Sequence, residues 1–271
     1  MLQRIIVTVI IVPLAILFIF LGGYAYQGLI TLLLAVAAWE YIKLLKMINL
    51  EPAAFLVLAG VILLSLSRSF FQFSYNSILI TGFLLGTAAY YIFQLERNAG
   101  KPAVDFGATL SVLFYIGILG PYLISLRSLP NGMWWTFLVL PVVWIADSFA
   151  YLVGTYFGKH KLAPKTSPNK TWEGYFGGIA GGVLSGIGLC SLYQGVFGAG
   201  MDITLLEAAI IALIISATIP LGDLTESMIK RQASTKDSGT LFPGHGGIFD
   251  RLDSLFWAAP IGYYLILHLF L

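Results

Sequence analysis

The sequence predicts an all-α polytopic integral membrane protein, and three observations support this fold class. Of its 271 residues, 58% are hydrophobic and only 10% are charged, whereas about a quarter of the residues in a soluble domain are charged. The apolar residues form long runs, without the ten-residue alternation of membrane β-strands. The basic residues collect on alternate connecting segments. Such a chain requires lipid around it, because water would leave large apolar surfaces exposed.

Nine apolar runs are candidates for membrane-spanning helices, because a bilayer core about 30 Å thick requires roughly 20 helical residues. The first run resembles a signal peptide, but its length and the close following run favour an uncleaved span. The second and third runs are the weakest candidates because they are short. The nine runs are Ile5–Leu21, Leu29–Ile42, Ala53–Leu66, Ile78–Phe93, Phe106–Leu126, Trp134–Phe157, Tyr175–Tyr193, Leu205–Leu221 and Leu255–Phe270.

The basic residues predict the orientation in the membrane. With a cytosolic N-terminus, only Arg68 and Arg127 fall on the outer side, and thirteen basic residues face the cytosol. Lys and Arg are enriched in cytoplasmic loops, so this bias supports both the span count and the orientation. A short chain without soluble tails favours a bacterial inner membrane. The thirteen are Arg4, Lys43, Lys46, Arg97, Lys101, Lys159, Lys161, Lys165, Lys170, Lys230, Arg231, Lys236 and Arg251.

The polar residues divide this single membrane domain into two functional halves near residue 140. Residues 1–140 have short connections without reactive side chains and form the N-terminal helical half. Residues 141–271 contain two long cytosolic segments, Gly158–Glu173 and Gly222–Ser254, which we expect to hold the catalytic motifs. The sole cysteine, Cys190, excludes an intrachain disulfide.

Acidic residues in the second segment are spaced so that helices would bring them together. If the helix that begins at Leu205 continues beyond the membrane, Asp223, Glu226 and Lys230 share one face. Asp250 and Asp253 are spaced in the same way at the start of the last helix. Two acidic pairs of this kind would suit a hard cation, which prefers oxygen ligands.

Basic residues and glycines lie between these acids. Glycine turns allow backbone amides to approach phosphate oxygens, and the basic side chains supply positive charge. The combination favours phosphoryl or nucleotidyl transfer. A solvated loop that follows the positive-inside rule is the alternative, although it would not explain the acids. For His245, a hydrogen bond that stabilises the turn is as plausible as contact with phosphate.

Three upstream features have a functional and a structural interpretation. Asp147 lies well inside a predicted span, where an acid is costly and by default suggests function; its alternative role is a helix-packing hydrogen bond. Lys170 could approach a triphosphate or serve only as a topogenic charge. Glycines at every fourth position from Gly174 to Gly186 predict a close-packing helix face, which would serve a monomer or a homodimer.

The stretch from Ser227 to Asp253 resembles the signature of the phosphatidate cytidylyltransferases, the CDP-diacylglycerol synthases. The segment Ser167–Gly174 is similar to a second conserved loop of that family, and the likeness extends upstream to Asp147. The signature positions are Ser227, Ile229, Lys230, Arg231, Lys236, Asp237, Gly239, Phe242, Pro243, His245, Gly246, Gly247, Ile248, Asp250, Arg251, Leu252 and Asp253.

The resemblance implies that CTP reacts with phosphatidate at the cytosolic membrane face, among membrane lipids and without nucleic acid. We expect Asp223 and Asp250 to bind Mg²⁺, and a second cation is an open question. Asp147, Glu226 and Asp253 are further candidate ligands. The expected catalytic residues are Asp223, Asp250, Lys230, Arg231, Lys236 and Asp237. The expected phosphate-binding residues are Lys170, Lys230, Arg231, Lys236, His245, Gly246, Gly247 and Arg251.

Two other functions use a similar set of residues. A CTP-dependent lipid kinase would transfer the γ-phosphoryl group and release CDP. A transporter would use Asp147 as a coupling site, but the acids concentrate at the cytosolic edge and no inverted repeat is evident. Another membrane class, the CDP-alcohol transferases, would show aspartates on consecutive helical turns, and that arrangement is absent.

Overall fold

The computed structural model describes residues 2–71, 74–98, 100–198, 203–239, 241 and 246–270, with side chains from residue 12 onward. Within these ranges all nine apolar runs form helices, although a turn at residues 119–121 divides the fifth run and Ala53 precedes its helix, and this confirms the all-α membrane fold. Among the described residues, seven helical segments are long and apolar enough to cross a bilayer. The count of nine spans and the cytosolic N-terminus stay predictions. The seven segments are Gly23–Met47, Ala54–Phe71, Asn76–Glu96, Pro102–Arg127, Gly132–Phe157, Trp172–Phe197 and Leu205–Gln232.

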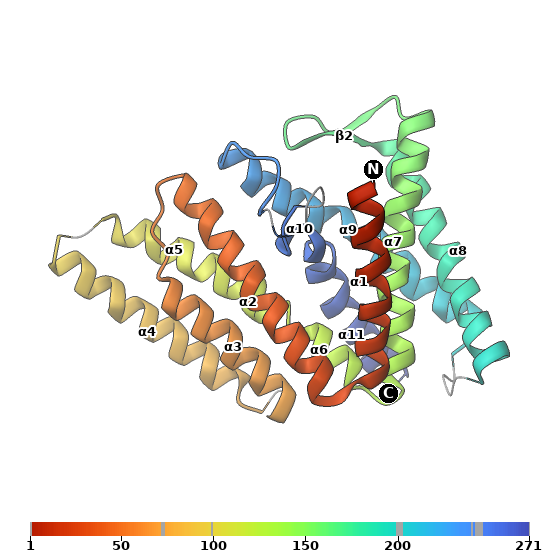
Figure 1. The fold of residues 1–271 in the computed structure, drawn as a ribbon, viewed down its shortest axis with the longest axis horizontal. Helices are drawn as coiled ribbons and strands as arrows, with labels where there is room; N and C mark the ends of the chain where they lie inside the picture. The colour runs from red at the N-terminus through yellow and green to blue at the C-terminus, as the bar shows by residue number, and fades with distance from the viewer. Residues whose placement is uncertain are drawn as a thin grey trace. The chain divides into compact units, whose positions relative to one another are not determined.

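The chain folds into two compact units, each built from two stretches of sequence (Figure 1). Unit 1 comprises Met1–Ser125 and Ile229–Leu252, and unit 2 comprises Leu126–Met228 and Asp253–Leu271. The predicted boundary near residue 140 separates chemical roles rather than packing units, and it stays a prediction.

Unit 1 is a helical assembly in which α2, α3 and α4 lie side by side (Figure 1). Apolar residues spaced three or four apart, such as Leu34 on α2 and Val57 and Val61 on α3, are fully buried. The π-helical turn η1 inserts Leu113 against Gly60, where a Cβ would lie 2.3 Å from the Leu113 side chain. Its helices are α1 (Leu2–Leu21), α2 (Gly23–Met47), α3 (Ala54–Phe71), α4 (Asn76–Glu96), α5 (Pro102–Val112), η1 (Leu113–Ile118), most of α6 (Tyr122–Arg127) and α10 (Phe249–Leu252).

Arg68, one of the two cations predicted outside the cytosol, is buried within unit 1. Its guanidinium lies 4.1 Å from the centre of the Tyr122 ring and donates a 3.0 Å hydrogen bond to Ser125 Oγ. The aromatic face and the hydroxyl replace part of the water that this charge loses on burial.

Unit 2 is built on close packing between α7 (Gly132–Phe157) and α8 (Trp172–Phe197), which lie side by side in Figure 1. The glycine stripe of α8 forms this contact, as predicted. A Cβ at Gly178 would lie 2.9 Å from the Cβ of Ala150, and one at Gly182 would lie 1.9 Å from Ser216 Oγ on α9 (Leu205–Gln232). The stripe therefore packs inside the unit. Helix α11 (Leu255–Phe270) completes unit 2, with Gly262 against Val139 of α7.

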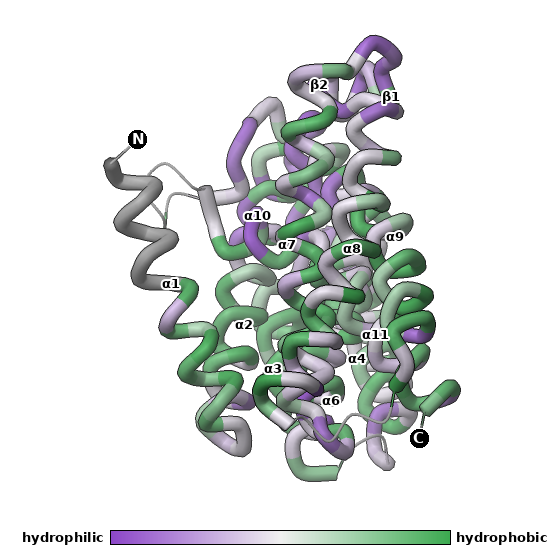
Figure 2. The backbone as a smooth tube through the Cα atoms, turned by 90° about the vertical axis from the view of Figure 1, so that its right-hand side faces the viewer, coloured by the Kyte–Doolittle hydropathy of each residue, from purple (hydrophilic) through white to green (hydrophobic). Residues whose placement is uncertain are grey.

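The segment between α7 and α8 forms a β-hairpin, where the sequence analysis expected a loop. Strands β1 (Lys161–Ala163) and β2 (Ser167–Thr171) pair antiparallel, with Lys161 opposite Thr171. Thr171 then caps α8 by accepting a 3.1 Å hydrogen bond from the backbone of Gly174. Figure 2 shows hydrophilic residues on this hairpin and mostly apolar residues along α7 and α8. A hairpin satisfies backbone groups that a loop at a membrane edge would leave unpaired.

Candidate active site

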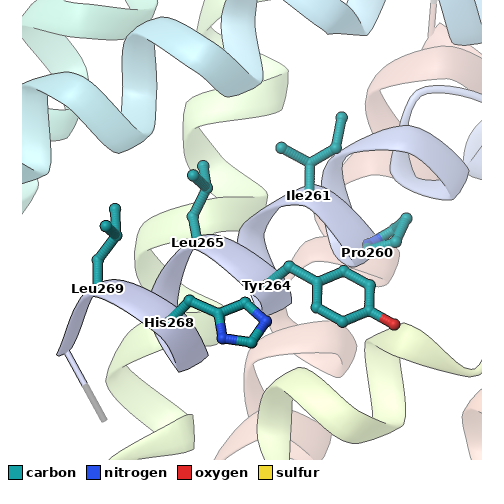
Figure 3. A pocket seen from close by; sticks show the side chains of 6 residues that line it. All are labelled: Pro260, Ile261, Tyr264, Leu265, His268 and Leu269. Carbon is teal, nitrogen blue, oxygen red and sulfur yellow. The ribbon is translucent and has the colours of Figure 1, made fainter.

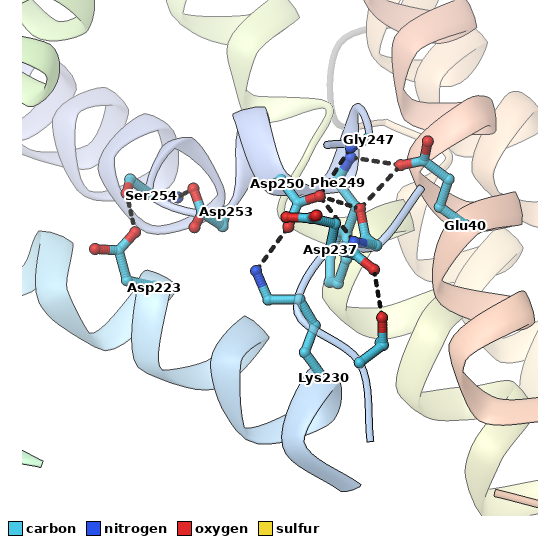
Figure 4. A network of polar contacts seen from close by, with 11 residues as sticks. Glu40, Asp223, Lys230, Asp237, Gly247, Phe249, Asp250, Asp253 and Ser254 are labelled. Carbon is cyan, nitrogen blue, oxygen red and sulfur yellow. Dashed lines mark hydrogen bonds and ion pairs between the residues drawn. The ribbon is translucent and has the colours of Figure 1, made fainter. Parts of the chain in front are cut away.

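The signature residues take part in two polar clusters, one in each unit. The Asp223 cluster, in unit 2, consists of Asp147, Lys170, Asp223, Glu226, Asp253 and Ser254. The Asp250 cluster, in unit 1, consists of Glu40, Lys230, Ser238, Gly247, Phe249 and Asp250. Figure 4 shows contacts of the Asp250 cluster and, from the Asp223 cluster, the residues Asp223, Asp253 and Ser254.

Asp223 is the centre of the first cluster. Helix α9 continues to Gln232, as the face argument required, and this places Asp223 beyond the apolar run. One carboxylate oxygen of Asp223 forms an ion pair with Lys170 of β2, and the other accepts a 2.9 Å hydrogen bond from Ser254 Oγ. Gly222 permits this approach, because a Cβ there would lie 2.6 Å from the carbonyl oxygen of Asp253.

Asp253 lies against Asp223, and the two carboxyls hydrogen-bond to each other. One oxygen of Asp253 also accepts a 2.7 Å hydrogen bond from the backbone of Ser254. Desolvation, followed by the charges of Asp223 and Glu226, raises the pKa of Asp253 well above its usual range. Two such carboxyls share a proton, since both cannot ionise together without a counter-charge between them.

Asp147 belongs to the same cluster, and its role as a metal ligand stays a prediction. It is held on α7, interacts electrostatically with Asp223 and Lys170, and hydrogen-bonds with Ser254. Glu226, one turn after Asp223 on α9, is 1% exposed and faces Asp253. All three predicted accessory ligands, Asp147, Glu226 and Asp253, therefore surround Asp223.

The structure positions Lys170 through the hairpin. Glu173, at the start of α8, accepts hydrogen bonds of 3.1 to 3.3 Å from the backbone amides of Lys159 and His160. It also accepts a 2.6 Å hydrogen bond from the His160 ring. These contacts close the base of the hairpin. Lys170 is therefore directed at Asp223 by folded structure rather than by a flexible loop.

The Asp250 cluster holds a carboxylate that accepts four hydrogen bonds. Asp250 Oδ1 accepts a 2.6 Å hydrogen bond from Lys230, whose side chain is 13% exposed. Asp250 Oδ2 accepts three hydrogen bonds of 2.8 Å, from the backbone and hydroxyl of Ser238 and from the backbone of Gly247. Gly246 must be glycine, because its φ is +79° and a Cβ would lie 2.4 Å from Asp250.

Glu40 of α2 is a member of this cluster that the sequence analysis missed. Its carboxylate is 5% exposed and accepts hydrogen bonds from the backbone of Phe249 (2.8 Å) and the hydroxyl of Ser238 (3.2 Å). The signal was present, because Glu40 is an acid within the predicted span Leu29–Ile42. The cost of an acid in a span, applied to Asp147, would have identified it too.

The remaining predicted residues lie elsewhere on the signature segment. Gly246 and Gly247 are buried beside Asp250, whereas His245 falls outside the described residues. Their phosphate-binding roles stay predictions, as do the phosphate-binding or catalytic roles of four exposed side chains. These four are Arg231, Lys236, Asp237 and Arg251.

The acids of the Asp223 cluster have donor atoms that bear on metal binding. Among the described residues, no group of three or more His, Cys, Asp or Glu side chains is arranged to hold a metal ion as it stands. The acids of the Asp223 cluster nevertheless offer only hard oxygen donors, and Asp253 interacts electrostatically with both Asp223 and Glu226. This donor set fits Mg²⁺ better than a soft metal.

A recess of about 410 Å³ on α11 lies apart from the predicted residues (Figure 3). It is lined by one face of the helix, from Pro260 to Leu269, and its surface is almost entirely apolar. It lacks the cationic and backbone donors that a triphosphate requires.

Comparison with known proteins covers both units. The family described as the cytidylyltransferase family matches residues 2–270. A Synechocystis protein named phosphatidate cytidylyltransferase is 35% identical, with 97% of this chain and 96% of that protein covered. Proteins of the same name from Bacillus subtilis and Brucella abortus are 36% and 38% identical, covering 93% and 78% of this chain and 93% and 70% of their own lengths.

Proposed function

The chain belongs to the cytidylyltransferase family, and from this premise we propose that it converts CTP and phosphatidate to CDP-diacylglycerol and pyrophosphate. The observation that carries the proposal is the match over residues 2–270, which includes every acid and lysine of the two clusters. Relatives that share more than a third of their residues over most of this chain are named for the same activity. The enzyme is thus a nucleotidyltransferase of phospholipid biosynthesis.

The reaction requires alignment and charge neutralisation more than acid–base chemistry. A phosphate oxygen of phosphatidate attacks the α-phosphorus of CTP, the bond from that phosphorus to the bridging oxygen breaks, and pyrophosphate leaves. Because the nucleophile is already an anion, no strong general base is required. The site must instead hold two anions in line and offset the charge that develops on the leaving group.

Lys170 and Lys230 bind phosphate oxygens in this proposal. Each ammonium forms an ion pair with a carboxylate, Asp223 or Asp250, that fixes its position. A lysine ammonium has three donors, so Lys170 can contact Asp223 and a phosphate oxygen together. Fixed cations of this kind lose little freedom when the substrate binds, which favours in-line positioning.

Carboxylate oxygens of the Asp223 cluster hold Mg²⁺ in this proposal, with Asp223 and Asp253 as the central pair and Asp147 and Glu226 beside them. The bound ion supplies charge neutralisation at the phosphates of CTP. Asp250, the other main Mg²⁺ ligand expected from the sequence, already accepts four hydrogen bonds, so this proposal gives it the role of holding Lys230 and the signature segment instead.

CTP with label on the α- or the γ-phosphate tests the reaction in detergent micelles that contain phosphatidate and Mg²⁺. We expect α-label to enter the lipid while pyrophosphate is released, and chelation by EDTA to stop the transfer until Mg²⁺ is restored. Entry of γ-label would instead identify a lipid kinase. Transfer of neither label, over a series of divalent metals and lipid acceptors, would favour the transporter interpretation.

A further inference from the structure

Glu40 is a buried carboxylate that contacts the signature loop, by which we mean the described residues 236–239 and 246–250. Helix α2 needs no acid for packing, since Leu34, Ala37, Ala38 and Ile42 around it already form an apolar core. A buried carboxylate is costly unless hydrogen bonds satisfy it. Here the donors come from the two ends of the loop: the hydroxyl of Ser238 and the backbone of Phe249.

Ser238 links Glu40 to the lysine-binding aspartate. Its hydroxyl lies 3.2 Å from Glu40 and 2.8 Å from Asp250, and its backbone also donates to Asp250. Asp250 in turn accepts the hydrogen bond from Lys230. A continuous chain of polar contacts therefore runs from a membrane helix to the lysine that we assign to phosphate binding (Figure 4).

Two glycines of the loop have the shape that this contact requires. A Cβ at Gly239 would lie 2.4 Å from Glu40 Oε1, and a Cβ at Gly247 would lie 2.2 Å from Oε2. Neither has a positive φ, so close approach to the carboxylate, rather than backbone strain, excludes a side chain at these positions.

The neighbouring residue on α2 holds the same part of the loop. The ring of Tyr41 stacks on the ring of Phe249, with centroids 5.1 Å apart, and Tyr115 meets that ring edge-on at 6.3 Å. Phe249 is fully buried. Consecutive residues of α2 thus fix both the backbone and the side chain of Phe249, directly before Asp250.

We propose that Glu40 is a positioning residue for cytidylyl transfer: it holds both ends of the signature loop so that Asp250 presents Lys230 to the substrate phosphates. The inference rests on the proposed function for its catalytic consequence. Its structural part, the restraint of the loop, stands on the contacts alone.

The test combines hydrogen–deuterium exchange of the loop with kinetics in detergent. Glu40→Ala removes the acceptor, so we expect faster exchange in peptides covering 236–250 and a fall of about 100-fold in kcat/KM for CTP. Glu40→Gln keeps one acceptor oxygen for Phe249, and we expect it to recover most of the protection and most of the activity. Asp105→Asn is the matched control. Asp105 is an equally buried acid of unit 1, but it accepts hydrogen bonds from the backbone amides of Glu51 and Lys101 and not from the signature loop.

Gly247→Ala tests the same contact from the loop side if Glu40→Ala is poorly folded. It should displace the Glu40 carboxylate, speed exchange of the loop and lower kcat/KM in the wild-type background, and do the same in the Glu40→Gln background, whose side chain has the same size. Where Glu40→Ala does fold, Gly247→Ala should add little to it, because the atoms that the new methyl group would meet are gone. Independent effects of the two substitutions, or unchanged loop exchange in Glu40→Ala, would overturn the inference. A wild-type protein that transfers no label would overturn the proposed function instead, and the exchange measurement would still judge the loop contact.

Discussion

Individual acidic residues have different tasks although the sequence presents them as similar pairs. Asp223 and Asp253 share a hydrogen bond and face further acids, whereas Asp250 is surrounded by donors. The first arrangement leaves negative charge to be neutralised, and the second has already been neutralised by the fold. This difference is why we assign metal binding to the Asp223 cluster and loop and lysine positioning to Asp250.

The raised pKa of Asp253 predicts a pH dependence of stability in Mg²⁺-free detergent. An unfolded aspartate titrates near pH 3.9, whereas folded Asp253 keeps its proton to a higher pH. Between these two pKa values the native state binds more protons, so stability falls as pH rises. We expect the melting temperature of Asp253→Asn to decline less than that of the wild type between pH 4 and 7. If the melting temperatures of the two proteins fell equally with pH, Asp253 would not be the cause of the pH dependence.

Two lysines of the same hairpin, Lys170 and Lys165, can separate the effect of a cation held at the site from the effect of positive charge in general. Lys170 forms the ion pair with Asp223, while Lys165 is exposed between the two strands. We expect Lys170→Ala to lower kcat/KM for CTP by about 100-fold, because a fixed cation at the phosphates is lost. Lys165→Ala removes the same charge from the same hairpin and should leave kcat/KM unchanged. Equal losses in the two variants would indicate a general effect of charge on CTP attraction.

At the scale of elements, the glycine stripe of α8 sets how closely the helices of unit 2 approach. Gly178 has no room for a Cβ, since Ala150 and the backbone of Ala146 lie within 3.0 Å. Gly188, on the same helix, has no neighbour within 4 Å of that position. At all four glycines of the stripe a Cβ would lie within 3.0 Å of another atom, whereas Gly188 lies outside the stripe and is open, so the four-residue spacing marks the packed face.

Gly178→Ala and Gly188→Ala test this packing. We expect Gly178→Ala to lower the free energy of unfolding by about 1–3 kcal/mol, because the added methyl group separates α7 from α8. Gly188→Ala should be neutral or stabilising by up to about 1 kcal/mol, since alanine is the better helix former. Denaturant titration in detergent measures both values. Equal stabilisation of the two variants would show that helix propensity and not close packing controls these positions.

At the scale of the whole molecule, the charge bias assigns both polar segments to the cytosolic face, and accessibility can test that orientation. The sole native cysteine, Cys190, is buried, so a Cys190→Ala background is suited to single-cysteine labelling. We expect Lys165→Cys to react with a membrane-impermeant maleimide in inverted bacterial membrane vesicles, and Ser128→Cys to react in spheroplasts. The reverse pattern would invert the predicted topology.

Sequence alone was sufficient for the membrane fold, the helix positions, the signature and most members of the clusters. Run length and charge segregation are local properties that bilayer thickness converts directly into structure. Helical spacing likewise placed Asp223 and Glu226 together on α9, whose continuation the structure confirmed.

Only the tertiary structure decided which residues are partners, because pairing across the sequence depends on packing that no local pattern contains. Glu40 and Phe249 are separated by 209 positions along the chain, and Lys170 and Asp223 by 53. The β-hairpin and the assembly of each unit from two stretches were also invisible to hydropathy. The sequence thus determined which chemical groups this protein has and where its helices run, while the folded chain decided which lysine each aspartate is paired with and which acids gather into one cluster.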